Sequence, residues 1–430
     1  MASPFLVTPW RTQLTPSFRI THAKGVWVTP DGGPPLWDSA SQLMVANLGH
    51  AHPMVVGMLQ DAVETAGHLV PGVDSPWRDV FIEAMTPLLP SGFGPILLTT
   101  GGADAIENAI KVARMATGRS IVLTKNQSYH GATWAALTAS GDARKAGLMG
   151  LEAPGFASIE TANCASCMWG QEPASCQREC LTHLEGVIED VGANRIAAIL
   201  LEGESGTSGC IQYPDGYWVA VRALADRYGI CLIADEVMSG FGRCGDWFAV
   251  SRYGVVPDMV VVAKGLTNGA VPMGAVLMRE SLVLPRYQRE PLLVGMTYSA
   301  HPLGCAAAVA SIRGLSPVIH RAKELEGWWG LELQRALGGI EVVTNIRTRG
   351  FLGAFDVVDP KTKYPLIPRN GANEWDGHIK NALFEAGVYP LTRWSHVFVA
   401  PPVVATLDEL RELAHRLQVA MKAVQDRVKT

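Results

Sequence analysis

Residues 230–237 read ICLIADEV and residues 257–265 read PDMVVVAKG. Each stretch holds a short apolar run that ends in a charged side chain, Asp235 in the first and Lys264 in the second. Apolar runs of this length predict buried strands of a parallel sheet. Ligands of such sheets bind where strands end, so both charged groups are candidates for a ligand site. Taken singly, a solvated turn or a metal ligand would also explain the carboxylate, and an exposed strand end would explain the lysine.

The same pattern extends in both directions from these two stretches. Short apolar runs alternate with amphipathic stretches from about residue 95 to residue 280, which is typical of a parallel sheet covered by helices on both faces. After residue 302 a long helical stretch and segments punctuated by glycine and proline predict a second, smaller lobe. The expected strands are 96–99, 121–124, 196–201, 230–234, 259–263 and 274–278, and the expected helices include 103–116, 217–228 and 407–428.

Length and composition limit the classes of protein that need to be considered. At 430 residues the chain is too long for one ordinary core, and 48% hydrophobic and 18% charged residues with a net charge of -4 describe a soluble globular protein. No basic excess suggests nucleic acid, so we expect small-molecule partners. Residues 1–19 are unlike a signal peptide, and no uninterrupted apolar run approaches the length of a membrane span. We therefore expect a cytoplasmic protein without a membrane partner.

Four short motifs form one extended pattern: DEV at 235–237, GFGR at 240–243, PD at 257–258 and AKG at 263–265. This pattern resembles class III aminotransferases, and the resemblance runs from NLGH at 47–50 to the two prolines at 401–402. It implies pyridoxal phosphate as cofactor and the α/β fold of type I pyridoxal-phosphate enzymes, in which a mostly parallel seven-stranded sheet forms a large domain beside a smaller α+β domain.

The resemblance also implies how the chain is divided and assembled. Residues 1–65 and 313–430 would form the small domain, and residues 66–312 would form the cofactor-binding large domain. The enzyme would be a homodimer with shared active sites, either alone or paired into a tetramer.

Roles for the residues around the cofactor ring follow from the same resemblance. Lys264 matches the lysine that carries the cofactor covalently and later moves a proton between substrate and cofactor. Asp235 matches the aspartate that pairs with the pyridine nitrogen, so that the ring can accept electrons. Val237 matches the residue on one face of the ring, and Tyr129, followed by His130, matches the aromatic residue on the other. Without the family match, Tyr129 would be a packing residue at a loop edge.

The cofactor phosphate is expected at a glycine turn that opens the first expected helix. Gly101, Gly102 and Ala103 match the family's phosphate loop, where free backbone N–H groups and the helix dipole favour an anion. The family commonly has serine at position 101 and glutamate at position 104, where this chain has Asp104. Thr297 matches a threonine that reaches the phosphate from the partner subunit, which implies that activity requires the dimer. Ordinary turns would also explain these residues.

Glu202 ends the expected strand at 196–201 and matches the glutamate of a Glu-Pro pair near the cofactor. Here Gly203 replaces the proline and Glu204 replaces the usual aliphatic residue. The residue pattern contains no physical reason for these two departures.

The substrate is predicted from the residues that would bind its acidic end. In the 4-aminobutyrate and ornithine branches a glutamate pairs with an arginine just before the two prolines, whereas this chain has Thr207 and Phe398 there. Arg393 resembles instead the mobile-loop arginine of amine:pyruvate and ω-amino-acid:pyruvate enzymes, which binds a carboxylate or sulfonate and swings away for an apolar side chain. Met44 stands where amine transaminases often have tryptophan, which predicts a differently shaped substrate pocket.

We therefore expect an ω-amino acid, a taurine-like compound or a primary amine as amino donor, and pyruvate or another 2-oxo acid as amino acceptor. Other functions stay open. A decarboxylase, an aminomutase or a racemase would keep Lys264 and Asp235, because the bond broken depends on which substituent the pocket holds perpendicular to the ring. A non-catalytic scaffold is disfavoured by the intact ring-binding residues. Arg393 would otherwise be an ordinary surface-loop arginine.

Four of the eight cysteines lie in a polar segment at 163–180 that has no periodicity and is expected as a surface excursion between strands. They are Cys164, Cys167, Cys176 and Cys180. Four thiols at this spacing could bind zinc in a closed tetrahedral site, or their closeness could be incidental. The other four are scattered singly and are expected as reduced thiols.

Overall fold

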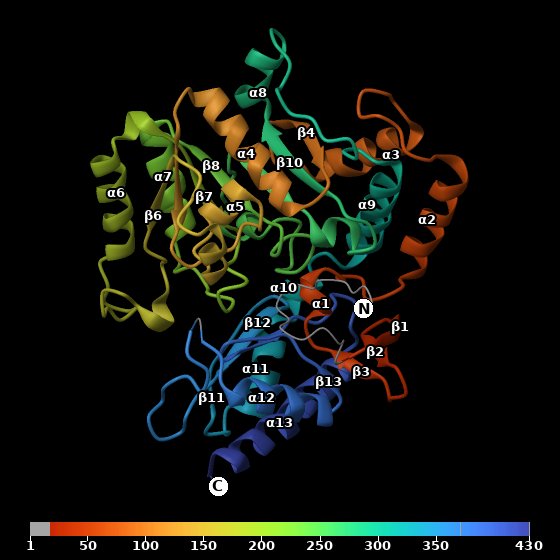
Figure 1. Ribbon diagram of the computed structural model, residues 1–430, viewed down its shortest axis with the longest axis vertical. Coiled ribbons are helices and arrows are strands. Elements are labelled where there is room, and N and C mark those ends of the chain that lie inside the picture. Colours follow the sequence, from red (N-terminus) through yellow and green to blue (C-terminus); the bar gives the residue numbers. More distant parts are fainter. Residues whose placement is uncertain (1–17, 370, 430) are drawn as a thin grey trace, which may run out of the picture.

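The computed structural model describes residues 18–369 and 371–429, so residues 1–17 of the expected N-terminal segment lie outside the described residues. Its largest element is a seven-stranded sheet in the order β4-β10-β9-β8-β7-β5-β6 (Figure 1). β10 runs antiparallel to both of its neighbours, and the other strand pairs are parallel. The mostly parallel seven-stranded sheet is therefore confirmed. The strands are β4 Phe93–Thr99, β5 Ile121–Lys125, β6 Phe156–Ile159, β7 Ile196–Glu202, β8 Cys231–Asp235, β9 Met259–Val262 and β10 Gly274–Arg279.

Helices cover both faces of this sheet. In β8, Ile233 packs in the apolar cluster on one face, and Leu232 and Ala234 pack in the cluster on the other. Because both faces are buried, the strands read as continuous apolar runs rather than as alternating ones. One face is covered by α4 Gly102–Thr117, α5 Trp134–Ala139 and α8 Glu280–Tyr287, and the other by α6 Glu179–Val191, α7 Tyr217–Tyr228 and α9 Pro302–Leu315.

β6 is the strand of this sheet that the apolar pattern does not predict. It lies at the sheet edge, and among its four residues Ile159 is buried while the others are exposed or half-buried. It therefore contains no continuous apolar run. The polar segment at 163–180 follows directly and contains the short 3-10 turn η3 Cys164–Ser166 before α6 begins. The expected surface excursion between strands is confirmed.

The first strands of the described chain and its C-terminal part build a second lobe, which lies below the large sheet in Figure 1. An antiparallel sheet in the order β11-β12-β15-β14 shares its core with three helices, and β13 pairs in parallel with β3 from the N-terminal part. This is the expected smaller α+β domain, whereas its boundaries at residues 65 and 312 stay a prediction. The elements are β1 Ile20–Lys24, β2 Trp27–Pro30, β3 Leu36–Asp38, β11 Val343–Arg349, β12 Leu352–Val357, β13 Val388–Tyr389, β14 Thr392–Arg393, β15 His396–Val399, α11 Glu326–Leu337, α12 Glu374–Glu385 and α13 Leu407–Lys429.

One stretch, Pro302–Glu324, has the length and mean hydropathy, 1.4, of a membrane span, but 67% of the apolar window is buried inside the protein. It contains α9, which packs against α2 Pro53–Thr65 and α3 Pro76–Met85. Cys305, Val309 and Leu315 are fully buried there. We therefore assign this stretch as a core helix of the large lobe.

Candidate active site

Adjacent strands of the large sheet bring the candidate catalytic residues together at the carboxyl ends of the strands. Glu202 at the end of β7 is paired in register with Asp235 at the end of β8, and Lys264 follows β9, the next strand. Lys264 has a φ of 46°, in the left-handed region that residues other than glycine rarely adopt. Strained backbone of this kind clusters at functional sites. The structure thus places the three side chains at the sheet edge where α/β proteins bind ligands.

The environment of Lys264 favours a neutral amine. Burial lowers the pKa of Lys264 to about 8, while the charges of Asp235 and Glu202 act in the opposite direction. A lysine with this pKa has a much larger neutral fraction near neutral pH than a surface lysine. The neutral amine is the form that attacks a carbonyl carbon or accepts a proton.

Asp235 is held in a fixed direction by two neighbours. The backbone N–H of Val237 donates to Oδ1 at 3.0 Å, and Nδ1 of His130 lies 2.7 Å from Oδ2. His130 is itself held by a hydrogen bond from its backbone N–H to Ser140 Oγ at 2.9 Å. Both ring and carboxylate are buried. His130, which the sequence pattern places only beside Tyr129, therefore orients the carboxylate expected to pair with the pyridine nitrogen.

The expected phosphate loop joins β4 to α4. Gly101 is the N-cap residue and Gly102 the first residue of the helix, so the first backbone N–H groups have no partner within the helix. A Cβ at Gly102 would lie 3.1 Å from Cγ1 of Val237, so glycine lets the helix start approach that side chain closely. Gly101 carries no hydroxyl where the family has serine, and the hydroxyl of the preceding Thr100 is engaged elsewhere: Oδ2 of Asp104 accepts hydrogen bonds from the Thr100 backbone N–H and Oγ1, at 2.7 and 2.6 Å.

The sequence pattern does not predict two residues of the site, Asp142 and Arg144. The Arg144 guanidinium carbon lies 3.6 Å from the ring centroid of Tyr129. Its Nε and Nη2 donate to Oδ1 and Oδ2 of Asp142 at 2.8 and 3.0 Å, and Nη2 of Arg393 donates to Oδ2 of the same carboxylate at 2.5 Å. The structure therefore brings Arg393, from β14 in the small lobe, into one cluster with Tyr129, Asp142 and Arg144.

A charge of this cluster affects the pKa of Lys264. Burial would raise the pKa of Asp142, but hydrogen bonds from Arg144 and the charges of Arg393 and Arg144 outweigh it and hold the pKa at about 2. The charge of Arg144 is also one of the causes that lower the pKa of Lys264. Arg144, which shares the Asp142 carboxylate with Arg393, is thus close enough to Lys264 for its charge to act on the amine.

Glu202 forms a buried ion pair that the sequence pattern does not indicate. Nζ of Lys125 lies 2.8 Å from Oε2 of Glu202, and both side chains are almost completely buried. The backbone N–H of Tyr129 donates to Oε1 of Glu202 at 3.4 Å, and the Tyr213 hydroxyl donates to the backbone carbonyl of Glu202 at 3.0 Å. Glu202 thus fixes the loop that carries Tyr129.

The structure explains why glycine follows Glu202. A Cβ at Gly203 would clash with the carboxylate of Glu236, which accepts hydrogen bonds from Ser239 and from the backbone N–H of Val250. Burial raises the pKa of Glu236 to about 7. Position 203 therefore has no room for the proline that the family commonly carries.

Glu204 at the next position joins the two lobes. It accepts a hydrogen bond from the Tyr253 hydroxyl, and Nε of Arg349, at the end of β11, lies 3.1 Å from its Oε1. Burial raises the pKa of Glu204 to about 7, although the charge of Arg349 acts in the opposite direction. A charged residue replaces the usual aliphatic one because a half-buried arginine faces it.

Two other predicted site residues lie at the periphery of this arrangement. Thr297 is exposed in this chain, and its contact with the phosphate of a partner subunit stays a prediction, as does the homodimer. Met44 is 1% exposed and packs in an apolar cluster with Phe398 and Ala40. Its φ of 56° is again left-handed. A direct contact of Met44 with substrate stays a prediction.

These residues fit pyridoxal phosphate by the chemistry of their side chains and by the close packing around them. A partly buried lysine with a lowered pKa, an oriented carboxylate and a helix N-terminus match the cofactor's aldehyde, ring nitrogen and phosphate in turn. Tyr129 and Val237 would supply an aromatic and an aliphatic side chain for the two ring faces. When bound, the cofactor supplies an electron sink for substrate carbanions. Lys264 would hold the cofactor and move a proton, and Asp235 would bind the ring nitrogen.

Comparison with known proteins agrees with this assignment. The model of the family described as Aminotransferase class-III matches residues 9–421. An omega-aminotransferase of Caulobacter vibrioides is 27% identical over 93% of this chain and 92% of its own, and a leucine/methionine racemase of Thermococcus litoralis is 29% identical over 90% and 87%. The crystal structure of taurine:2-oxoglutarate aminotransferase from Bifidobacterium kashiwanohense, in complex with PLP and glutamate, has a TM-score of 0.93 at 32% identity and covers 98% of this chain and 96% of its own. The chain therefore belongs to the class III aminotransferase family and is a pyridoxal-phosphate-dependent aminotransferase.

Proposed function

We propose that this enzyme transfers an amino group from an ω-amino acid or a taurine-like aminosulfonate to pyruvate or another 2-oxo acid, and that Arg393 and Arg144 bind the acidic end of the substrates. The observation that carries the proposal is the pair of guanidinium groups held by the buried carboxylate of Asp142, one of which, Arg144, acts by its charge on Lys264. Guanidinium groups match carboxylates and sulfonates because they donate parallel hydrogen bonds to two oxygens. The solved neighbour from Bifidobacterium kashiwanohense, whose name gives taurine and 2-oxoglutarate, supports the same substrate class.

The geometry leaves Arg393 able to bind a second anion. Its Nη2 donates to Asp142, and a guanidinium has five N–H donors, so an incoming carboxylate can bind the remaining edge or replace Asp142. The glutamate and arginine pair of the 4-aminobutyrate branch is replaced by Thr207 and Phe398 in this chain, which leaves Arg393 and Arg144 as the arginines proposed to bind the acidic end. Primary amines, the third class of donor expected from the sequence, would leave Arg393 on Asp142.

The proposal is tested with the variant Arg393→Leu and the control Arg369→Leu, which removes another arginine that lies against the Trp394 ring. For β-alanine, taurine and pyruvate we expect Arg393→Leu to lower kcat/KM by about 30- to 100-fold, the loss of a charge-assisted hydrogen-bonded contact of ~2 to 3 kcal/mol. For an apolar primary amine the kcat/KM of Arg393→Leu should differ from that of wild type by less than about threefold. The control variant should resemble wild type with all of these substrates. Equal losses for acidic and apolar donors would contradict the proposal.

Racemisation is a second candidate because a racemase is among the relatives at similar identity. Incubation of the holoenzyme with a chiral amino donor and no acceptor separates the two reactions. A transaminase converts one equivalent of donor per active site into the oxo product and then stops until a 2-oxo acid is added. A racemase converts the donor into its enantiomer without forming an oxo product, and a decarboxylase releases carbon dioxide.

A further inference from the structure

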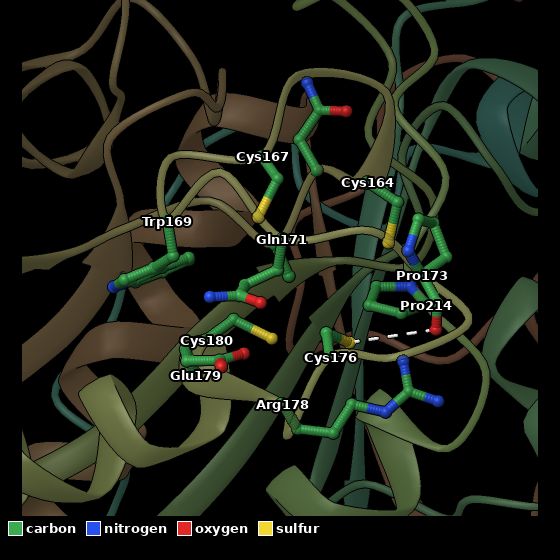
Figure 2. A pocket seen from close by; sticks show the side chains of 12 residues that line it. Cys164, Cys167, Trp169, Gln171, Pro173, Cys176, Arg178, Glu179, Cys180 and Pro214 are labelled. Carbon is green, nitrogen blue, oxygen red and sulfur yellow. Dashed lines mark hydrogen bonds between the residues drawn. The ribbon is translucent and has the colours of Figure 1, made fainter.

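Four cysteines outside the active site line one small cavity (Figure 2). The cavity has a volume of about 20 Å³, which is enough for one water molecule or one metal ion. In Figure 2 the sulfur atoms of Cys164, Cys167, Cys176 and Cys180 surround the same space, and the sequence segment that carries them folds back on itself around it. Residues 16 positions apart in the chain are thereby brought together.

The fold offers this segment few other means of holding its shape. All four cysteines are free thiols, and the short turn η3 is the regular structure described between β6 and α6. Trp169 packs against the large core, and Cys180, at 8% exposure, belongs to α6. A polar segment that buries so little apolar surface is commonly ordered by a disulfide or a metal ion.

We propose that Cys164, Cys167, Cys176 and Cys180 bind one zinc ion as a closed structural site. Four thiolates are a preferred ligand set for zinc, and two close pairs, with two and three residues between their members, suit a tetrahedral site. As the side chains stand, no group of three or more His, Cys, Asp or Glu among the described residues could hold a metal ion. The proposed site would therefore have to form on binding, through movement of the cysteine side chains.

Zinc binding would change the charge in the cavity. Binding of Zn²⁺ displaces four thiol protons and forms four Zn–S bonds, which leaves a local charge of -2. Arg178, whose side chain is positively charged, lines the cavity. It is placed to stabilise the dianionic centre.

The position of the cluster indicates what the ion would do. Cys164 and Pro173 also line a neighbouring cleft of about 740 Å³, whose other wall includes Arg369, Trp394 and His396 from the small lobe. Trp394 follows Arg393 directly. Zinc would therefore fix the wall of the cleft that faces the arginine strand, and it would act on structure rather than on the chemical step.

Metal content of the purified holoenzyme tests the site without reference to its activity. After expression with added zinc and purification without chelator, mass spectrometry should find one zinc ion per chain. The double variant Cys164→Ser, Cys176→Ser should lose the zinc, and the control Cys305→Ala, which removes a buried cysteine of α9, should keep it. Cobalt substitution should give the red-region bands of tetrahedral cobalt thiolate in the wild type and not in the double variant.

Other results of the same measurements would overturn the proposed zinc site. Zinc below about a tenth of an ion per chain after expression with added zinc would overturn the proposal, and so would zinc that persists in the double variant. Titration of thiols in denaturant adds a second measurement, because zinc ligands are released as thiols and all eight cysteines then react. If the cluster forms two disulfides instead, half of them react and the zinc site is excluded. None of these outcomes depends on which amino donor the enzyme uses.

Discussion

Nδ1 of His130 lies 2.7 Å from Oδ2 of Asp235, and both side chains are buried at the carboxyl end of the large sheet. The other carboxylate oxygen accepts the Val237 N–H at 3.0 Å. The imidazole and the backbone of the turn together fix the direction in which Asp235 meets the cofactor. We therefore expect His130 to act as a positioning residue for Asp235, the group that would bind the ring.

This relationship predicts a graded loss of activity. Asp235→Asn removes the charge that keeps the ring protonated and should lower kcat by at least about 100-fold. His130→Ala leaves the carboxylate but frees its orientation, and should lower kcat by about 10- to 100-fold, as partners of site residues commonly do. Single-turnover rates with a saturating donor, together with the absorption spectrum of the bound cofactor, measure both effects. A His130→Ala enzyme with wild-type rate and spectrum would show that the contact has no positioning role.

Lys264 predicts how cofactor incorporation depends on pH. Because its pKa is about 8, the neutral fraction rises about tenfold between pH 7 and pH 9 and then levels off. The rate at which apoenzyme takes up pyridoxal phosphate, followed by absorbance, should show the same rise and plateau. A lysine with an ordinary pKa would give a rise of about 100-fold over this interval without a plateau. Lys264→Ala serves as the control for non-covalent binding.

The same lysine affects the stability of the apoenzyme. Burial lowers its folded-state pKa from 10.5 to about 8, so the unfolded chain binds the proton more tightly between these pH values, and stability rises with pH in that window. Lys264→Met removes the buried amine and should raise the free energy of unfolding by about 1 to 2 kcal/mol at pH 7, with a smaller gain near pH 10. Urea denaturation of the two apoproteins measures the difference. A gain that grows with pH would have the wrong sign.

A side chain at position 203 would occupy the space that the Glu236 carboxylate fills, so the effects of mutating the two residues should depend on each other. Gly203→Ala should destabilise the protein by about 1 to 3 kcal/mol, because the new methyl group displaces a hydrogen-bonded buried carboxylate. In a Glu236→Ala background the same change should cost less than about 0.5 kcal/mol. Gly377→Ala in α12, where an added Cβ meets nothing within 4 Å, is the matched control and should not destabilise. Additive effects of the two changes would rule out the clash.

The raised pKa of Glu236 predicts a loss of stability with increasing pH. Its folded-state pKa of about 7 lies above the usual 4.5, so the folded protein binds more protons between these values and stability falls as pH rises through them. Glu236→Gln removes this pH dependence. The difference between the free energies of unfolding of the variant and of wild type should therefore shift in favour of the variant by about 1 kcal/mol between pH 5 and pH 8. Glu385→Gln, at an exposed site, should show no such trend in the same denaturation series.

Local features of the sequence were sufficient to predict the large sheet and the centre of the site. Six of its strands contain apolar runs that no surface segment would carry, and Asp235 and Lys264 stand directly at the ends of two of them. Because strand ends in a parallel sheet meet at one edge, the sequence alone determines that these two charges share a site. It does not reveal the edge strand β6, whose half-exposed residues form no apolar run.

Contacts between remote segments depend on how the lobes pack, and no local pattern encodes them. Arg393 reaches Asp142 across 251 residues, and Glu204 meets Arg349 from the other lobe. Gly203 is required because a side chain from the neighbouring strand end occupies the space beside it. The sequence by itself therefore determined the fold, the family pattern and the catalytic pair. Only the tertiary structure decided which charges surround that pair, because ion pairs and steric limits depend on distances between segments that folding brings together, within the large lobe for Gly203 and Glu236 and between the lobes for Arg393 and Asp142.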